Sequence, residues 1–347
     1  MSIRKIASIS GFSTATVSLA LRNNPKIPEE TRRKIRRIAQ RCGYSPDPRV
    51  RDLMGVVRQS ADPGNRGCIG VISFYDSPRP WERSRHLSRL YEGMTIRSEE
   101  LGYRLEPMWL RAPDMTSRRF RNILDTRGIE GLVCFGSPNI GEGFPPEFDH
   151  YSIVTQGVSI RTACHRVINN AFSDTQRVLN RLQKLGYRRP GLILSNYEHH
   201  RGAHANLSAY LGWCENYIGD PRLVPVLRID TVEPEFVLAW IKSHKPDVIL
   251  VVHDANALSA FNSLLRDNGI SVPDDLGVAA LSPILHGTPF SGIEEDQHLM
   301  GAWVVELVVS RIMNRDFGVP KNPRTEMVEG LWIEGKSLRA ADSDDNG

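Results

Sequence analysis

Short polar side chains follow a glycine close to the N-terminus, on a stretch that can contact nucleic acid. Gly11 interrupts a helical pattern of apolar residues, and Ser13 stands where a helix N-cap is expected. Val17, Ala20 and Leu21 then form a second apolar stripe. The side chains left free to face outward are those of Thr14, Ala15, Thr16, Ser18 and Leu19. Two short helices about such a turn predict a helix-turn-helix whose second helix enters a DNA major groove, although an ordinary helical hairpin fits these residues too.

The distribution of charge favours the DNA-binding interpretation. Residues 1–58 carry 13 Lys and Arg against 4 Asp and Glu, a net charge of +9. The whole chain has a net charge of +4, so the remaining 289 residues carry −5. A basic head on a mildly acidic body is typical of a protein whose head binds a polyanion.

A third helix and a stiff connector complete the head. Pro28 and the acidic pair Glu29 and Glu30 suit a helix start, and Gly43 ends the pattern. The exposed face of this helix is rich in arginine, which is either a phosphate-binding surface or simply a solvated face. The extended segment 44–48 leads to a short amphipathic piece at 49–54 and a polar linker at 58–67.

The rest of the chain alternates apolar runs with amphipathic stretches, which predicts parallel sheets covered by helices. Strands are expected at 68–74, 103–109, 131–135, 151–155, 190–194, 223–229, 248–252, 277–281 and 325–332. Helices are expected at 86–101, 116–126, 173–185, 203–217, 234–244, 255–268 and 300–313. Two sets of alternating elements predict two lobes, and residues 338–347 are expected to be a disordered tail.

Ligands of open parallel sheets bind beyond the carboxyl ends of the strands. This rule places a ligand site near Tyr75, Asp76 and Trp81 in the first set, and near Gln156. In the second set it indicates Asn196, His253 and Asp254. Lobe packing or a solvated loop is the alternative role for each of these residues.

Composition and motifs argue against several other classes of protein. The five cysteines are far apart and form no CxxC pair, which is typical of free thiols in a reducing cytosol. We find no membrane span, no signal peptide, and none of the catalytic motifs GxSxG, P-loop or GxGxxG. His199, His200 and His204 are expected to lie in a solvated loop rather than to bind a metal. We therefore expect a cytoplasmic protein without cofactor or metal, and no enzyme.

The motifs GFSTATVSLAL, IPEETRRKI and GYSPDPRVRDL, in this order and spacing, resemble the DNA-binding head of the LacI/GalR family of bacterial transcriptional regulators. The resemblance extends to about Ser337. It implies an α/β protein with an all-α helix-turn-helix head (1–57 including a hinge helix), a linker (58–67) and a two-lobed, periplasmic-binding-protein-like sensor and dimerisation body (68–337). It also implies a homodimer that binds a pseudo-palindromic operator under the control of a small-molecule effector.

The resemblance assigns further residues. In the family, hinge helices enter the minor groove and wedge a leucine between base steps, and Leu53 matches that leucine. The DNA-binding set expected from the motifs is Ser13, Thr14, Ala15, Thr16, Ser18, Leu19, Arg22, Asn23, Tyr44, Arg49, Arg51 and Leu53. Leu19 stands where the family often has an arginine, so a guanine contact there is not expected.

The effector site departs further from the family pattern. Asp254 matches a family aspartate that accepts ligand hydroxyls, whereas Asn206 stands in place of an effector-binding arginine. The expected effector-binding set is Tyr75, Asp76, Trp81, Gln156, Asn206 and Asp254. Because few cations are expected there, an uncharged polyol or sugar derivative is favoured as effector. The prediction is thus a transcription regulator, most simply a repressor, and the alternative is a small-molecule transport protein without a DNA role.

Overall fold

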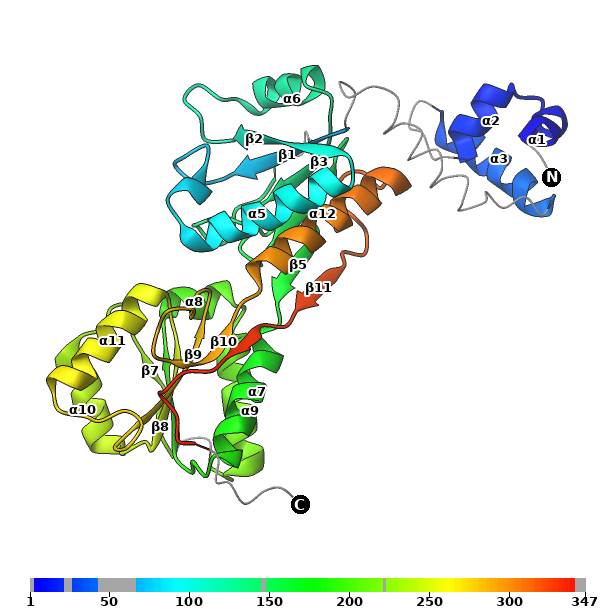
Figure 1. Cartoon of the computed structure of the whole chain (residues 1–347). Coiled ribbons are helices and arrows are strands. Elements are labelled where there is room, and N and C mark those ends of the chain that lie inside the picture. The colour runs from blue at the N-terminus through cyan, green and yellow to red at the C-terminus, as the bar shows by residue number, and fades with distance from the viewer. Residues whose placement is uncertain (1–2, 22–26, 43–66, 145–147, 221–222, 341–347) are drawn as a thin grey trace.

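The computed structural model describes residues 3–21, 27–42, 67–144, 148–220 and 223–340 (Figure 1). These residues form a three-helix head and a body with two six-stranded sheets. The predicted hinge at 49–54, the linker up to residue 66 and the tail from residue 341 lie outside the described residues.

The head consists of α1 (Ile3–Ser10), α2 (Thr14–Leu21) and α3 (Glu29–Arg41). Gly11 has a φ of +71°, which permits the sharp turn between α1 and α2. The hydroxyl of Ser13 accepts a hydrogen bond from the N–H of Thr16 at 3.0 Å, so the predicted N-cap is confirmed. Ile6, Val17 and Ile35, one from each helix, are fully buried in the head's small core.

The first lobe has an entirely parallel sheet with the strand order β11-β5-β4-β3-β1-β2. Its strands are β1 (Gly67–Ser73), β2 (Tyr103–Trp109), β3 (Ile129–Cys134), β4 (Ser152–Gln156), β5 (His165–Asn169) and β11 (Thr325–Val328). Its helices are η1 (Pro80–Glu82), α5 (Arg85–Glu100), α6 (Ser117–Thr126) and α12 (Gln297–Asn314). Side chains of α5 and α12 cover one face of the sheet, and those of α6 pack on the other.

The second lobe has the strand order β12-β10-β9-β8-β6-β7, in which only the β10–β12 pair is antiparallel. Its strands are β6 (Pro190–Leu194), β7 (Leu227–Arg228), β8 (Val248–Val252), β9 (Gly277–Ser282), β10 (Ser291–Glu294) and β12 (Leu331–Ile333). Its helices are α7 (Ala171–Lys184), α8 (Asn196–Arg201), α9 (Ala205–Tyr217), α10 (Pro234–His244) and α11 (Ala255–Asp267). Helices α7 and α9 cover one face and α10 and α11 the other.

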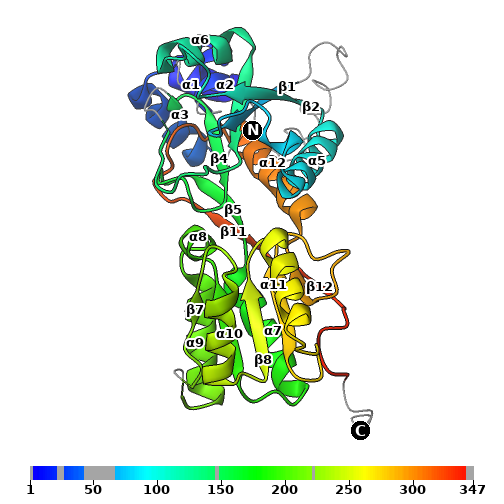
Figure 2. The same cartoon turned by 90° about the vertical axis from the view of Figure 1, so that its left-hand side faces the viewer.

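The chain crosses between the lobes three times (Figure 2). It passes from β5 to α7, returns from β10 to α12, and passes again from β11 to β12. The predicted two-lobed α/β architecture is therefore confirmed, including strands that were placed to the residue at 103–109, 190–194 and 248–252.

Several local predictions were wrong. The single strand expected at 325–332 is two strands, β11 and β12, in different sheets, because this segment is the third crossover. Strands β5 and β10 and the helix α8 were missed. The tail boundary also shifts: Leu338 is buried in the second lobe, and the N–H of Arg339 donates to the Tyr187 hydroxyl at 3.0 Å. No helix in the described part of the chain is long and apolar enough to cross a membrane.

Helices α5 and α12 pack backbone against backbone. A Cβ added at Gly93 would collide with the carbonyl oxygen of His298, and one added at Gly301 would collide with that of Leu90. Both glycines lie within helices, where glycine lowers helix stability relative to alanine. Their role is to allow the backbones of the two helices to approach closely. The contact holds α12, the helix that follows the second crossover, against α5 of the first lobe (Figure 1).

We predict that Gly301→Ala lowers the free energy of unfolding by about 1–3 kcal/mol, because the two helices must move apart. The matched control is Gly212→Ala on α9, where an added Cβ meets no atom within 4 Å. That variant should be stabilised by up to about 1 kcal/mol through helix propensity. Urea unfolding of both variants measures the difference, and equal stability of the two would show that the α5–α12 contact is not close.

Candidate nucleic-acid interface and interlobe site

The second helix of the head presents a short polar surface. Thr14 is exposed, and the hydroxyl of Thr16 lies 2.8 Å from that of Ser13. Leu19 is only partly exposed, which suits an apolar contact better than a polar one. Thr14, Thr16 and Leu19 lie on α2, a helix of eight residues, and a DNA major groove is wide enough to admit an α-helix.

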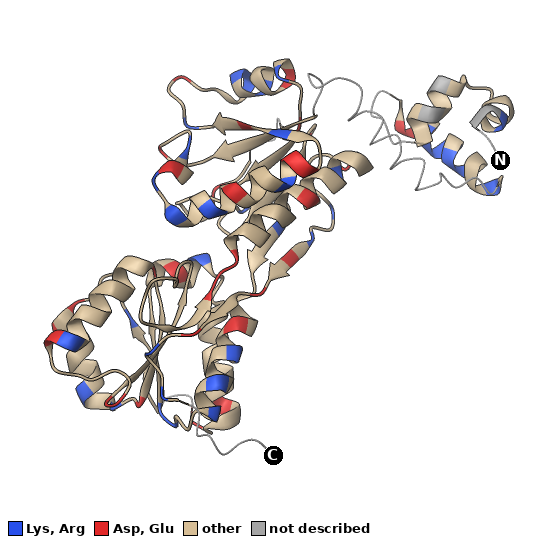
Figure 3. Ribbon diagram, in the orientation of Figure 1, with Lys and Arg blue, Asp and Glu red and all other residues tan. Residues whose placement is uncertain are grey.

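Helix α3 carries six of the 13 Lys and Arg residues of the head (Figure 3). Its exposed cationic side chains are Arg33, Lys34, Arg36, Arg37 and Arg41. Part of this charge is neutralised locally, because Glu29 pairs with Arg32 at 2.6 Å and with Arg33 at 3.0 Å. The hydrogen bond from Arg33 and the charge of Arg32 lower the pKa of Glu29. Pro28 precedes the helix without a side-chain cap.

Half of the predicted DNA-binding set cannot be placed. Arg22, Asn23, Tyr44, Arg49, Arg51 and Leu53 lie outside the described residues, and the side chains of Ala15 and Ser18 are likewise not described. The roles of these residues stay predictions.

A charged side chain joins the two lobes of the body. Arg201, the last residue of α8 in the second lobe, donates from Nη1 to the carbonyl oxygen of Ser137 at 3.1 Å. Ser137 follows β3 of the first lobe. The same nitrogen donates to the Tyr197 hydroxyl at 3.0 Å, and the guanidinium lies over the Tyr197 ring. Arg201 therefore connects the carboxyl ends of the two sheets.

The charge of Arg201 affects the pKa values of four further polar side chains. Burial raises the pKa of Tyr75, and the Arg201 charge partly offsets this rise. Burial and the Arg201 charge together lower the pKa of His86 to about 4, so this imidazole is neutral at pH 7. Burial raises the pKa of Glu198, and burial with the Glu198 charge raises that of Glu295 to about 7. We call these four residues and Arg201 the interlobe cluster.

The predicted effector residues fall into different surroundings. Tyr75 belongs to the interlobe cluster, and Asp76 is exposed, with its Oδ1 3.3 Å from Arg111. Gln156 ends β4 and is partly buried. Asp254 is the N-cap of α11 and accepts from the Ala257 N–H at 2.9 Å.

Two of the predicted effector residues have packing partners inside a lobe. Trp81 is 9% exposed and stacks on Tyr91 with ring centroids 4.1 Å apart. Asn206 is buried and donates to the Thr175 hydroxyl at 3.1 Å. These contacts account for both side chains as parts of a lobe interior, and their roles in ligand binding stay predictions.

Sequence reasoning missed the cation of this site. The replacement of an arginine by Asn206 led us to expect few positive charges between the lobes, and the one that we did not identify, Arg201, comes from α8. The sequence signal was the polar run at 196–201 directly after the β6 strand. Glu198 and Arg201 lie one helical turn apart in that run.

The histidine trio also differs from the prediction of a solvated loop. His199 lies in α8 and is 5% exposed, and the ring centroids of His199 and His204 are 4.2 Å apart. Burial lowers the pKa of His199, and the charge of His204 lowers it further. Among the described side chains, no group of three or more His, Cys, Asp and Glu is placed to hold a metal ion.

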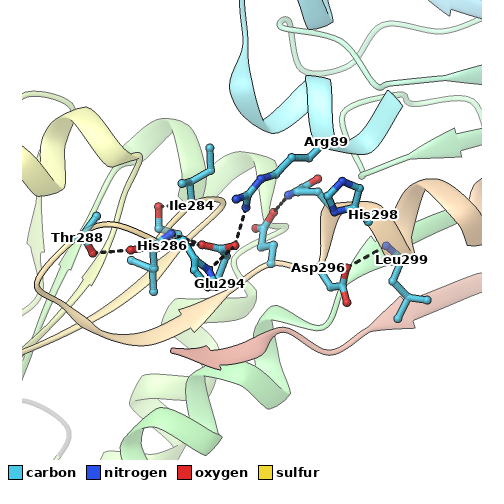
Figure 4. A network of polar contacts seen from close by, with 12 residues as sticks. Arg89, Ile284, His286, Thr288, Glu294, Asp296, His298 and Leu299 are labelled. Carbon is cyan, nitrogen blue, oxygen red and sulfur yellow. Dashed lines mark hydrogen bonds and ion pairs between the residues drawn. The ribbon is translucent and has the colours of Figure 1, made fainter. Parts of the chain in front are cut away.

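An ion pair joins the lobes at the second crossover (Figure 4). Arg89 on α5 donates from Nη1 to Oε1 of Glu294, the last residue of β10, at 2.6 Å. The other oxygen of Glu294 accepts from the backbone N–H groups of Leu285 and His286. Burial alone would raise the pKa of Glu294, but these hydrogen bonds outweigh it, so the pKa is lowered. The Glu294 carboxylate is thus held ionised at the second crossover between the lobes.

Two family models match the chain. Residues 2–47 match the model described as bacterial regulatory proteins, lacI family, and residues 179–338 match the model of a periplasmic binding protein-like domain. Together they span more than half of the 347 residues. Among curated protein sequences, none matches the chain significantly.

Solved structures share the fold. A transcriptional regulator CelR–cellobiose complex matches with a TM-score of 0.60 and 17% identity, over 97% of this chain and 99% of that one. A Lac repressor dimer bound to operator and the anti-inducer ONPF matches with a TM-score of 0.58 and 15% identity, over 98% and 99%. The regulator CcpA of Lactococcus lactis matches with a TM-score of 0.57 and 14% identity, over 79% and 100%.

We predict that Arg89→Ala lowers the free energy of unfolding by about 2–3 kcal/mol, because it leaves the Glu294 carboxylate buried without its cation. The control is Arg79→Ala, which removes an exposed pair with Glu82 and should cost at most about 1 kcal/mol. Thermal or urea unfolding of the full chain measures both. A cost for Arg89→Ala no greater than that of the control would mean that the Arg89–Glu294 pair does not stabilise the hinge.

Proposed function

The chain belongs to the LacI family of bacterial regulatory proteins, and from that premise we propose that it is a sequence-specific transcription regulator, most simply a repressor, controlled by an effector that binds between its lobes. The observation that carries this proposal is the combination of a lacI-family helix-turn-helix head with a periplasmic-binding-protein-like body in one chain. The head is a DNA-binding domain, and α2 is the helix that we assign to the major groove.

We propose that two copies of the chain bind one pseudo-palindromic operator. A single α2 reads only a few base pairs, so a two-fold symmetric dimer is needed to specify a longer site. The Lac repressor structure that shares this fold is a dimer bound to operator, which supports the same arrangement here. Leu53 is then the side chain proposed to enter the minor groove at the centre of the operator.

The chemistry of the interlobe cluster favours an uncharged polyol or sugar-like effector. Arg201 can donate hydrogen bonds to a ligand, and the carboxylates of Glu198 and Glu295 can accept them from a ligand. A hydroxyl group, which both donates and accepts, fits this combination. A phosphate or carboxylate ligand would face these two acids as well as the single arginine. The rings of Tyr75 and Tyr197 offer flat surfaces on which a sugar ring can pack. The relative CelR was solved with cellobiose, a ligand of this class.

Two other functions are less well supported. A small-molecule transport protein would share the two lobes, but the basic head would have no role in it. Loss of DNA binding on deletion of the head would support the regulator over the transport protein. An enzymatic role has no motif in its favour, and the matching family consists of regulators. As a regulator of transcription the protein is proposed to act in the cytoplasm.

We predict that binding to operator DNA falls steeply with salt, because the basic head displaces counterions from phosphates. If each subunit neutralises about 4 phosphates, the logarithm of the affinity should fall with the logarithm of the salt concentration at a slope of about −7. Fluorescence anisotropy across salt concentrations measures this slope. The chain without residues 1–57 is the control and should not bind. A flat response, or unchanged binding by the truncated chain, would exclude the proposed DNA-binding surface.

We predict that the stabilising ligands in a thermal-shift screen of metabolites are uncharged polyols or sugars. Arg201→Ala should abolish the ligand-induced shift, whereas Arg266→Ala, which removes an exposed arginine of α11, should leave it unchanged. Asp254→Asn should weaken the shift while keeping the cap of α11, because the neutral amide is a poorer acceptor for ligand hydroxyls. If only acidic or phosphorylated metabolites stabilise the protein, the proposed ligand chemistry is wrong.

A further inference from the structure

Two carboxyl groups interact electrostatically where the chain crosses between the lobes for the second time. Glu198 lies on α8 of the second lobe, and Glu295 lies on the crossover between β10 and α12. After burial, the charge of Glu198 is the largest influence on Glu295, and it raises the pKa of Glu295. Arg201 acts on both acids and lowers the pKa of each. Two acids that share one cation in a partly buried place do not both ionise without cost.

Glu295 is also the residue that ties two crossovers together. Its Oε1 accepts from the Asn169 side-chain amide at 3.0 Å, and Asn169 ends β5 at the first crossover. Its Oε2 accepts from the side-chain amide of Gln297, at the start of α12, at 2.5 Å. Protonation or ionisation of this one carboxyl group therefore changes its hydrogen bonds to both crossover segments and its electrostatic interaction with Glu198 of α8.

The surroundings of Glu295 can accommodate a proton. Gln297 is 2% exposed, and its Oε1 is a buried acceptor without a hydrogen-bond partner. The amide accommodates either state of Glu295: its nitrogen donates to the ionised carboxylate, and after a rotation its oxygen accepts from the protonated acid. In either state the amide keeps one hydrogen bond to Glu295, so both forms of the acid can be held at this position.

We propose that Glu198 and Glu295 form a proton-binding pair that couples the spacing of the two lobes to pH. With one proton bound, the pair carries a single charge opposite Arg201, and α8 stays against the hinge with its Arg201–Ser137 contact made. Without that proton, the two carboxylates repel each other and favour separation of α8 from the crossover. Proton binding itself is independent of the proposed function. Its consequence, an effector response that changes with pH, rests on that function.

The charged groups that face Glu295 determine the direction in which stability changes with pH. Burial, Glu198 and Asp174 raise its pKa, Arg201 and the Gln297 hydrogen bond lower it, and the result is a pKa of about 7. Between the ordinary value of 4.5 and about 7, the folded chain holds a proton that the unfolded chain has released. Stability contributed by this group is therefore present at low pH and is lost as the pH rises through that window.

The first test is thermal unfolding of the full chain from pH 5 to pH 8. The readout is the difference in Tm between wild type and Glu295→Gln, because the variant carries a permanent neutral group of the same shape. Wild type should lose about 2–4 °C relative to the variant as the pH rises. Glu198→Gln removes the like charge that raises the pKa of Glu295, so this variant should complete the loss at lower pH than wild type. The loss should also be smaller, because the difference between the folded and unfolded pKa is smaller.

The matched control is Glu130→Gln, which removes an exposed carboxylate of β3 and should follow the wild-type profile. Parallel profiles of wild type and Glu295→Gln would overturn the proposal. Neither DNA nor effector enters this experiment, so its failure is separate from a failure of the proposed function.

The second test measures the lobe spacing directly. Spin labels on cysteines introduced at Asn122 on α6 and Ser243 on α10, in a Cys42→Ser background, report the distance between the lobes. Labelled chains are diluted with unlabelled protein so that only distances within one chain contribute. The distance distribution should shift between pH 5.5 and pH 8.5 in wild type and stay constant in Glu295→Gln. A distribution that is independent of pH in wild type would contradict the coupling.

Discussion

Three crossovers of the chain at one side of two parallel sheets are the constraint on which the body depends. They make the carboxyl ends of the strands of both lobes face each other, so that Ser137 after β3 meets Arg201 at the end of α8. Strand ends are also where polar loops begin, because the apolar runs stop there. Charged and hydroxyl groups therefore gather between the lobes, while the apolar side chains fill the layers on either side of each sheet.

The second crossover concentrates several roles in three consecutive acids. Glu294 pairs with Arg89 of the first lobe and accepts two backbone hydrogen bonds in the second. Glu295 joins two crossover segments, and Asp296 caps α12 by accepting from the Leu299 N–H at 3.0 Å (Figure 4). Since α12 packs tightly against α5, a movement at these acids is transmitted to the first lobe. An effector between the lobes can shift this equilibrium only through its different affinities for the two arrangements.

Local patterns predicted most of the fold, because buried parallel strands appear as apolar runs and helices as amphipathic stretches. Local patterns failed where pairing with neighbouring strands decides whether a segment becomes a strand. His165–Asn169 contains three polar residues and becomes β5 because β4 and β11 pair with it on both sides. The head was predicted from the Ser13 cap and the apolar stripes together with the family motifs. The contact between Arg201 and Ser137 could not be predicted, since the two residues are distant in sequence and meet only through the crossovers.

The head is proposed to read DNA as part of a symmetric dimer whose body senses a ligand. The most direct measurement is selection of binding sites by the full chain from a library of random DNA duplexes, followed by sequencing. Two similar half-sites related by two-fold symmetry should be enriched. DNA recognition by a symmetric dimer is contradicted if no sequence is enriched, or if the chain without residues 1–57 enriches the same sites.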